Sequence, residues 1–232
     1  FFNKQNFRTI IKTRYIDIVT KHKIFGTYDM NDQNIQINDD KKIFNKIKQL
    51  SNKVENIIIA DYGHGMISSF LAKKICNLNV KISLNAQINA ANVGYHNLRN
   101  YKNIHNLIIN EAEIRSEFRD KNSDLKYLAY KLLKKINCKY LVITRGSNGA
   151  ILFTKINKQI IDCPAFTEYA IDKIGSGDTM LSVLTLALNK KVPTDLAIFF
   201  GNIIGSMSVQ IIANKNPIKF QDLFKTIESV LK

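Results

Sequence analysis

Short apolar runs alternate with longer amphipathic stretches along most of the chain. The apolar runs lie at residues 56–60, 80–84, 107–109 and 140–144. They are apolar at nearly every position, which is typical of parallel strands buried on both faces. The amphipathic stretches lie at residues 41–54, 111–118 and 124–136, with apolar side chains at helical spacing. This alternation predicts an α/β fold in which helices cover a mainly parallel sheet.

The first forty residues follow a different pattern. Residues 9–17 alternate polar with apolar positions, and a second run of this kind at 23–28 follows a polar turn. Such a pair predicts a β-hairpin. Because an isolated hairpin is only marginally stable, we expect it to lie against a larger structure or to pair with further strands.

Two more short runs, 150–154 and 158–162, predict an antiparallel edge to the sheet, and two or three helices follow them. We therefore divide the chain into a partial hairpin unit at 1–38 and an α/β core at 39–232. No internal repeat or flexible linker interrupts the core.

Polar residues stand where the predicted strands end. They are Asp61, Asn85, Asn110 with Glu113, Thr144 with Gly146, and the loop 172–178. In open α/β sheets, ligands bind at the carboxyl ends of the strands. The shared position of these residues therefore indicates a binding site at that edge of the sheet.

The loop Asp172-Lys173-Ile174-Gly175-Ser176-Gly177-Asp178 precedes a helical run. Two glycines around a serine allow a sharp turn that points the backbone N–H groups of Gly175, Ser176 and Gly177 outward at a helix start, which favours anion binding. Asp178 can then take a proton from a hydroxyl group. The alternative is that Asp178 only stabilises the helix dipole.

Asn110 and Glu113 lie three residues apart after a strand, on one face of a helix. An amide and a carboxylate in this arrangement suit a hydrated Mg²⁺ beside phosphates. A capping box explains the same pair without a metal, and the two interpretations are compatible.

Two turns have both a structural and a functional interpretation. In the turn 144–149, Gly146 and Gly149 would let the backbone approach a nucleotide, with Arg145 near its phosphates. Alternatively, the two glycines only supply the positive φ angles that a hairpin turn needs. In the turn 61–65, Asp61 and His64 either present a carboxylate and an imidazole to substrate hydroxyls or belong to a tight strand-to-helix connection.

Composition narrows the partners. The net charge is +15, but only 6 of the 34 basic residues are Arg, and Ile, Lys and Asn number 35, 28 and 26, as codon bias would produce. Base reading favours Arg, so we expect no nucleic-acid partner. The three Cys residues are widely spaced, which predicts small buried side chains rather than a metal site.

No apolar stretch is long enough to span a membrane, and no signal-peptide pattern follows Phe1, which favours a cytoplasmic protein. A first residue other than Met suggests a fragment of a longer chain. The chain also lacks a P-loop, a Gly-x-Gly-x-x-Gly turn after a first strand and a protein-kinase His-Arg-Asp set.

Together, these motifs resemble those of the ribokinase-like (PfkB) family of carbohydrate kinases. The loop 172–178 is similar to that family's D-T-x-G-A-G-D signature, with Lys for Thr and Ser for Ala. Residues 110–113 match its N-x-x-E motif, and 144–149 match its T-x-G-x-x-G turn. Asn202 stands where members place a small-residue helix against the adenine.

The resemblance implies a three-layer α/β/α sandwich with a partial β lid at the hairpin. It implies transfer of the γ-phosphoryl group of ATP to a sugar hydroxyl, with Asp178 as base and the amides of Gly175, Ser176 and Gly177 stabilising charge. It also implies that Asn110 and Glu113 bind Mg²⁺ and that Asp172 binds a monovalent cation such as K⁺. Asp61 and His64 would contact the substrate. The residues implied to contact the nucleotide are Thr144, Arg145, Gly146, Gly149 and Asn202.

Within the family, residues 60–65 and the hairpin are most similar to the heptose-phosphate kinase branch, whose segment reads S-D-Y-x-K-G. Kinase domains of that branch often occur beside a nucleotidyltransferase domain, and we expect a homodimer through the β lid. His64 replaces the usual Lys, and residues 84–87 replace D-P-K, which leaves the sugar open. Nothing before Thr9 matches the family's Gly-Gly strands, so a non-catalytic nucleotide-binding fragment or interaction module is the alternative function.

Overall fold

The computed structural model describes residues 9–20, 23–31, 33–88, 92, 98–167, 169–212 and 215–232. Six of its strands form one sheet: β3 (Asn56–Asp61), β4 (Lys81–Ala86), β5 (Asn106–Asn110), β6 (Tyr140–Thr144), β7 (Ala150–Thr154) and β8 (Ile160–Cys163). They lie side by side in chain order: β3 to β6 run parallel, β7 runs antiparallel to β6, and β8 runs antiparallel to β7. The predicted mainly parallel sheet with an antiparallel edge is confirmed.

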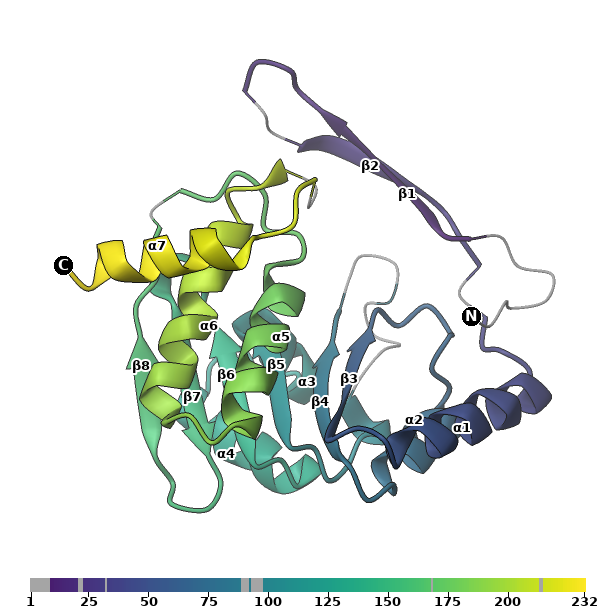
Figure 1. The fold of residues 1–232 in the computed structure, drawn as a ribbon. Helices are drawn as coiled ribbons and strands as arrows, with labels where there is room; N and C mark the ends of the chain where they lie inside the picture. The colour runs from purple at the N-terminus through teal and green to yellow at the C-terminus, as the bar shows by residue number, and fades with distance from the viewer. Residues whose placement is uncertain are drawn as a thin grey trace.

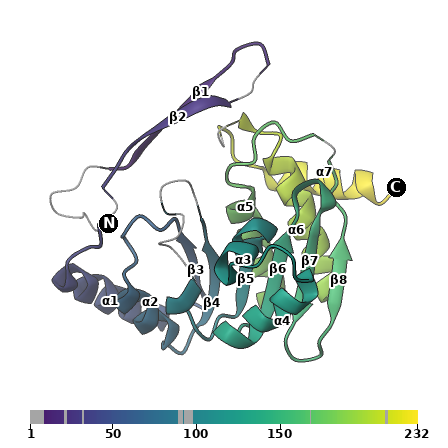
Figure 2. The same cartoon turned by 180° about the vertical axis from the view of Figure 1, so that it is seen from behind.

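Helices cover both faces of this sheet (Figures 1 and 2). One face carries α1 (Ile37–Ser51), α2 (Ser69–Cys76), α3 (Glu111–Phe118) and α4 (Leu125–Ile136). The other carries α5 (Ser176–Asn189) and α6 (Thr194–Ser208), with α7 (Phe220–Val230) packed against α6. Each face has its own apolar core. The result is the three-layer sandwich expected from the sequence. The described residues also include two short 3₁₀ turns, η1 (Leu98–Asn100) and η2 (Gly146–Asn148).

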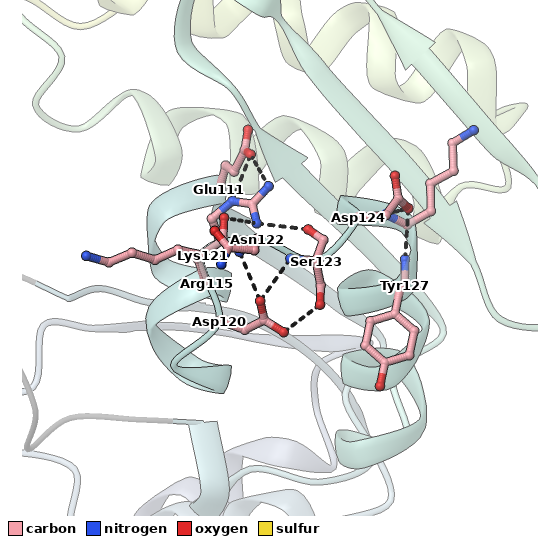
Figure 3. A network of polar contacts seen from close by, with 9 residues as sticks. Glu111, Arg115, Asp120, Lys121, Asn122, Ser123, Asp124 and Tyr127 are labelled. Carbon is pink, nitrogen blue, oxygen red and sulfur yellow. Dashed lines mark hydrogen bonds and ion pairs between the residues drawn. The ribbon is translucent and has the colours of Figure 1, made fainter.

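The connection between α3 and α4 is held by a local polar network (Figure 3). Arg115 pairs with Glu111 at 2.8 Å and donates to the carbonyls of Lys121 and Ser123. Asp120 accepts hydrogen bonds from the backbone and the hydroxyl of Ser123, which lower the pKa of this exposed carboxyl. These contacts tie the connection between the two helices to the last turns of α3.

The predicted hairpin is present as β1 (Ile11–Ile16) and β2 (Lys23–Asp29), while Lys21 and His22 of its turn lie outside the described residues. It stands apart from the sandwich, beyond the end of the sheet at which α5 begins (Figure 1). Tyr15 and Phe25 stack on one face of it at 4.2 Å between ring centroids, and both are about half exposed.

Helix α1 begins earlier than the pattern predicts, at Ile37 rather than near Lys41. The proposed boundary between residues 38 and 39 therefore falls inside its first turn. The polar sequence there is part of the helix because acidic side chains suit a helix N-terminus, and because Asp40 is buried and accepts a hydrogen bond from Ser68 at 2.6 Å.

Cys76, Cys138 and Cys163 are buried free thiols, as the spacing predicted. No helix within the described ranges has the length and apolar character needed to cross a membrane.

Candidate functional site

The N-terminus of α5 meets the carboxyl ends of β3 and β4. Gly175 precedes the helix with φ of 80°, a conformation that favours glycine. The first amides of a helix have no partner within it, and among the described residues no acceptor contacts the amides of Gly175, Ser176 or Gly177. A Cβ on Gly177 would lie 2.8 Å from the side-chain nitrogen of Asn85, at the end of β4. The residues present therefore form a narrow anion site of backbone donors.

Asp178, in the first turn of α5, has two side-chain donors. The hydroxyl of Tyr62 donates to its Oδ2 at 2.7 Å, and the amide of Gln87 donates to both carboxylate oxygens at 3.3 Å. Tyr62 follows β3 and Gln87 follows β4. Partial burial, together with the Asp178 hydrogen bond and negative charge, raises the pKa of Tyr62 to about 12. Tyr62 therefore stays protonated and acts as a donor at neutral pH.

Asn110 and Glu113 form the capping box that the sequence offered as one interpretation. The Asn110 side chain accepts from the Glu113 amide at 2.7 Å, and the Glu113 carboxylate accepts from the amide of Asn110 at 2.9 Å and of Ile88 at 3.0 Å. Burial raises the pKa of Glu113.

A fit to Mg²⁺ follows from these contacts. Each carboxylate oxygen of Glu113 already receives one amide and retains one acceptor position. No group of three or more His, Cys, Asp or Glu side chains suited to a metal occurs in the part of the chain that the structure describes. The pair therefore fits a hydrated Mg²⁺ held through its waters, which is the usual mode for this ion, rather than a cage of protein ligands.

The turn after β6 is built on two glycines with positive φ, Gly146 at 60° and Gly149 at 74°. A Cβ on Gly149 would lie 2.1 Å from the carbonyl oxygen of Cys163 and within 2.7 Å of two further backbone atoms. From α6, Asn202 donates to the carbonyls of Cys163 and Pro164 at 2.9 and 3.2 Å. Two separate elements thus hold the chain as it leaves β8.

The guanidinium group of Arg145, in the same turn, donates hydrogen bonds to two nearby residues. Its guanidinium donates to Asp162 on β8 at 2.5 Å and to the carbonyl of Asn148 at 2.7 Å. In this structure the charge of Arg145 is paired with a carboxylate, and its predicted place beside nucleotide phosphates stays a prediction.

Asp61, the last residue of β3, and His64, in the loop that follows, are both buried. The carboxylate of Asp61 accepts from the Gly63 amide at 2.9 Å and from the Tyr101 hydroxyl, and burial beside this carboxylate raises the pKa of Tyr101. At the loop before α5, Asp172 accepts from the Ile174 amide at 3.0 Å. In this structure Asp61 and Asp172 thus hold the backbone of their own loops, and the ligand roles predicted for them and for His64 stay predictions.

The structure therefore brings Asp178 and the 175–177 amides together with Tyr62 and Gln87, which the sequence interpretation did not assign to the site. Tyr62 directly follows Asp61, and Gln87 lies in the segment that departs from the heptose-phosphate kinase pattern. Their positions at strand ends were the available signal.

Comparison with known proteins gives matches to one family. The family profile described as "pfkB family carbohydrate kinase" matches residues 66–219. The bifunctional protein HldE of Campylobacter curvus is 28% identical over 178 residues, which cover 75% of this chain and 37% of that protein. An uncharacterized sugar kinase of Buchnera aphidicola is 28% identical over 156 residues, covering 66% of this chain and 48% of that protein. The chain thus spans well under two thirds of the length of these relatives.

Solved structures agree on the fold. The ribokinase of Thermotoga maritima superposes with a TM-score of 0.73 at 15% identity, covering 96% of this chain and 70% of that one. The ribokinase of Arabidopsis thaliana, solved with ribose and ATP, gives 0.66 at 14% identity, with 96% and 70% coverage. At this identity the likeness concerns the fold alone, and that fold is ribokinase-like.

Proposed function

The chain belongs to the pfkB family of carbohydrate kinases, and we propose that it transfers the γ-phosphoryl group of ATP to a hydroxyl group of a sugar or sugar phosphate. The observation that carries this proposal is the position of Asp178 directly after three backbone amides at the start of α5. An anion site with an adjacent carboxylate suits phosphoryl transfer to an alcohol.

In this mechanism Asp178 accepts the proton of the attacking hydroxyl group. The amides of Gly175, Ser176 and Gly177 stabilise negative charge on the phosphoryl oxygens as the transfer proceeds. Thr144, Arg145, Gly146, Gly149 and Asn202 line the nucleotide side. Gly149 and Asn202 support this assignment because both contact the same backbone segment after β8 and so shape one wall.

Cations are part of the proposal. Bound Mg²⁺ would neutralise charge on the nucleotide phosphates, and Asn110 and Glu113 would orient its waters. Asp172 would hold a monovalent cation such as K⁺ beside the loop. The support for Asp172 is its position at the start of the loop, where it already holds the Ile174 amide.

The substrate side rests on the HldE relatives, which favour a heptose-phosphate-like acceptor. Asp61 and His64 would face that acceptor. A nucleotidyltransferase domain, fused or separate, is the corresponding partner, since those relatives are named bifunctional. A homodimer through the hairpin is favoured by the exposed Tyr15–Phe25 stack, and a cytoplasmic location stays a prediction.

Substitution of Asp178 by Asn tests the base. We expect sugar-dependent ADP formation to fall by about 10²–10⁴-fold, the typical contribution of a general base, while ATP affinity is retained. The assay uses ribose, fructose 6-phosphate and a heptose phosphate as acceptors. Asp195→Asn is a matched control, because Asp195 also lies in the first turn of a helix, α6. Undiminished turnover in Asp178→Asn, or an equal loss in Asp195→Asn, would contradict the role.

The alternative, a nucleotide-binding module without catalysis, is favoured by the chain's span of 37% of HldE. Measuring ATP binding and ATP turnover on one sample separates the two functions. Binding without turnover with any acceptor would favour the module.

A further inference from the structure

Two neutral donors from two different strand ends fix the carboxylate of Asp178. Tyr62 donates to Oδ2 at 2.7 Å, and Gln87 bridges both oxygens at 3.3 Å. An ionised carboxylate has about four acceptor positions, so three are occupied and one remains on Oδ1. Neither donor carries a charge. Within the described ranges, the carboxylate is therefore oriented by hydrogen bonds from neutral groups rather than by an ion pair.

The two donors are also tied to each other. The Gln87 amide donates to the Asp61 carbonyl at 2.9 Å. The side-chain nitrogen of Asn92, which is buried, donates to the carbonyls of Tyr62 and Gln87, at 3.0 Å each. A displacement of Tyr62 therefore moves its neighbour Gln87 as well.

The β1–β2 hairpin contacts the aromatic ring of Tyr62 through Lys12. The ammonium group of Lys12 on β1 lies 5.4 Å from the centroid of the Tyr62 ring and 5.6 Å from that of Tyr28 on β2. Both distances are within the range of a cation–π contact. Partial burial, followed by the charge of Arg14, lowers the pKa of Lys12. Lys12 thus links the hairpin to the ring whose hydroxyl group holds Asp178.

We propose that Tyr62 is a positioning residue that orients the Asp178 carboxylate and couples it to the β1–β2 hairpin through Lys12. The catalytic part of this inference rests on the proposed function. Without the Tyr62 hydroxyl, the carboxylate keeps only the longer contacts with Gln87, and its terminal torsion is intrinsically broad. The free Oδ1 position would then no longer point in one direction, and a hydroxyl acceptor would be deprotonated less often per encounter.

The coupling is tested first by a measurement that needs no activity. In the full chain labelled with ¹³C at the phenolic carbon of tyrosine, Tyr62→Phe identifies the Tyr62 resonance by its loss. We expect that resonance to shift in Asp178→Asn and, in the same direction, in Lys12→Met, which keeps the aliphatic stem. Lys42→Met, on the exposed face of α1, is the matched control and should leave it unchanged.

Kinetics then test the positioning role. Tyr62→Phe keeps the ring and should lower kcat about tenfold, a factor at the low end of what one hydrogen bond to a charged carboxylate contributes, with little change in the KM for ATP. Lys12→Met should lower kcat less. In the Tyr62→Phe background, Lys12→Met should have no further effect, because the coupling runs through the hydroxyl group.

The outcomes separate this inference from the proposed function. A Tyr62 resonance that is unmoved in both Asp178→Asn and Lys12→Met overturns the coupling whatever the activity is. Unchanged kcat in Tyr62→Phe, or additive losses in the double variant, overturns the positioning role. Full turnover in Asp178→Asn overturns the base itself, while the resonance shifts still decide whether the contacts exist. Thermal unfolding of each variant identifies any that fail to fold.

Discussion

The two sides of Asp178 are built differently. On the side of β5 to β8, backbone atoms leave no room for a side chain at Gly149, Asn202 is buried and Glu113 accepts hydrogen bonds from two backbone amides. On the side of β3 and the hairpin, Tyr62 is 41% exposed, and the Lys12 ammonium group of the hairpin lies 5.4 Å from the centroid of its ring. The first side is rigid because main-chain atoms meet there. The second is joined by a few side-chain contacts, which suits a region that admits a substrate.

Gly149→Ala should destabilise the side of the molecule in which main-chain atoms meet. The new methyl group would lie 2.1 Å from the Cys163 carbonyl oxygen in a backbone conformation that disfavours side chains, so we expect a loss of about 3 kcal/mol or more in the free energy of unfolding. Gly146→Ala has open space but positive φ and should cost about 1–2 kcal/mol.

Gly205→Ala completes this series. It lies in α6 with open space around it and should be neutral or stabilise by about 0.5–1 kcal/mol. Denaturant unfolding measures all three variants. Equal losses at Gly149 and Gly146 would show that backbone conformation, rather than the close approach, sets the cost.

Glu113 tests the rigid side at a second position. Glu113→Ala leaves the amides of Asn110 and Ile88 without their acceptor and should cost about 2 kcal/mol. Glu113→Gln keeps one acceptor oxygen and should cost less. If Glu113 also orients Mg²⁺, Glu113→Gln should raise the Mg²⁺ concentration needed for half-maximal turnover. Equal Mg²⁺ dependence in Glu113→Gln and the unmodified protein would leave the residue a structural role only.

On the side of β3 and the hairpin we expect the smallest effect on the free energy of unfolding, and this effect depends on pH. The pKa of Tyr62 in the folded protein, about 12, is higher than the ordinary value of 10.0. The stability that Tyr62 contributes is therefore present below pH 10 and is lost as pH rises toward 12. Tyr62→Phe should show a shallower loss of stability over this window in urea titrations. Identical slopes would show that the Tyr62–Asp178 contact adds no measurable stability.

The periodic parts of the chain were predictable because burial imposes spacing. The parallel strands, the hairpin and the Asn110–Glu113 capping box follow from local patterns, as does the glycine turn before Asp178. The contacts of Asp178 were not predictable. Tyr62 and Gln87 lie 116 and 91 residues away from it in the chain, and only the packing of α5 against the ends of β3 and β4 brings them together.

Polar sequence also concealed the start of α1. The predicted helix began at Lys41, but Asp39 and Asp40 belong to the first turn of α1, and Asp40 accepts a hydrogen bond from Ser68, which lies 28 residues further along the chain. Arg145 is similar. Its pairing with Asp162 depends on the register of β7 against β8, which local pattern does not specify.

The lack of space for a side chain at Gly149 has a consequence for the way mutations accumulate in this region. A side chain at this position would meet main-chain atoms of Cys163, Pro164 and Ala165. The partially exposed side chain of Ala165 can therefore change without altering the space around Gly149. In a library of all single substitutions, we expect Gly149 to be intolerant of every replacement and Ala165 to accept many. Selection would then act most strongly on the residue that has no side chain.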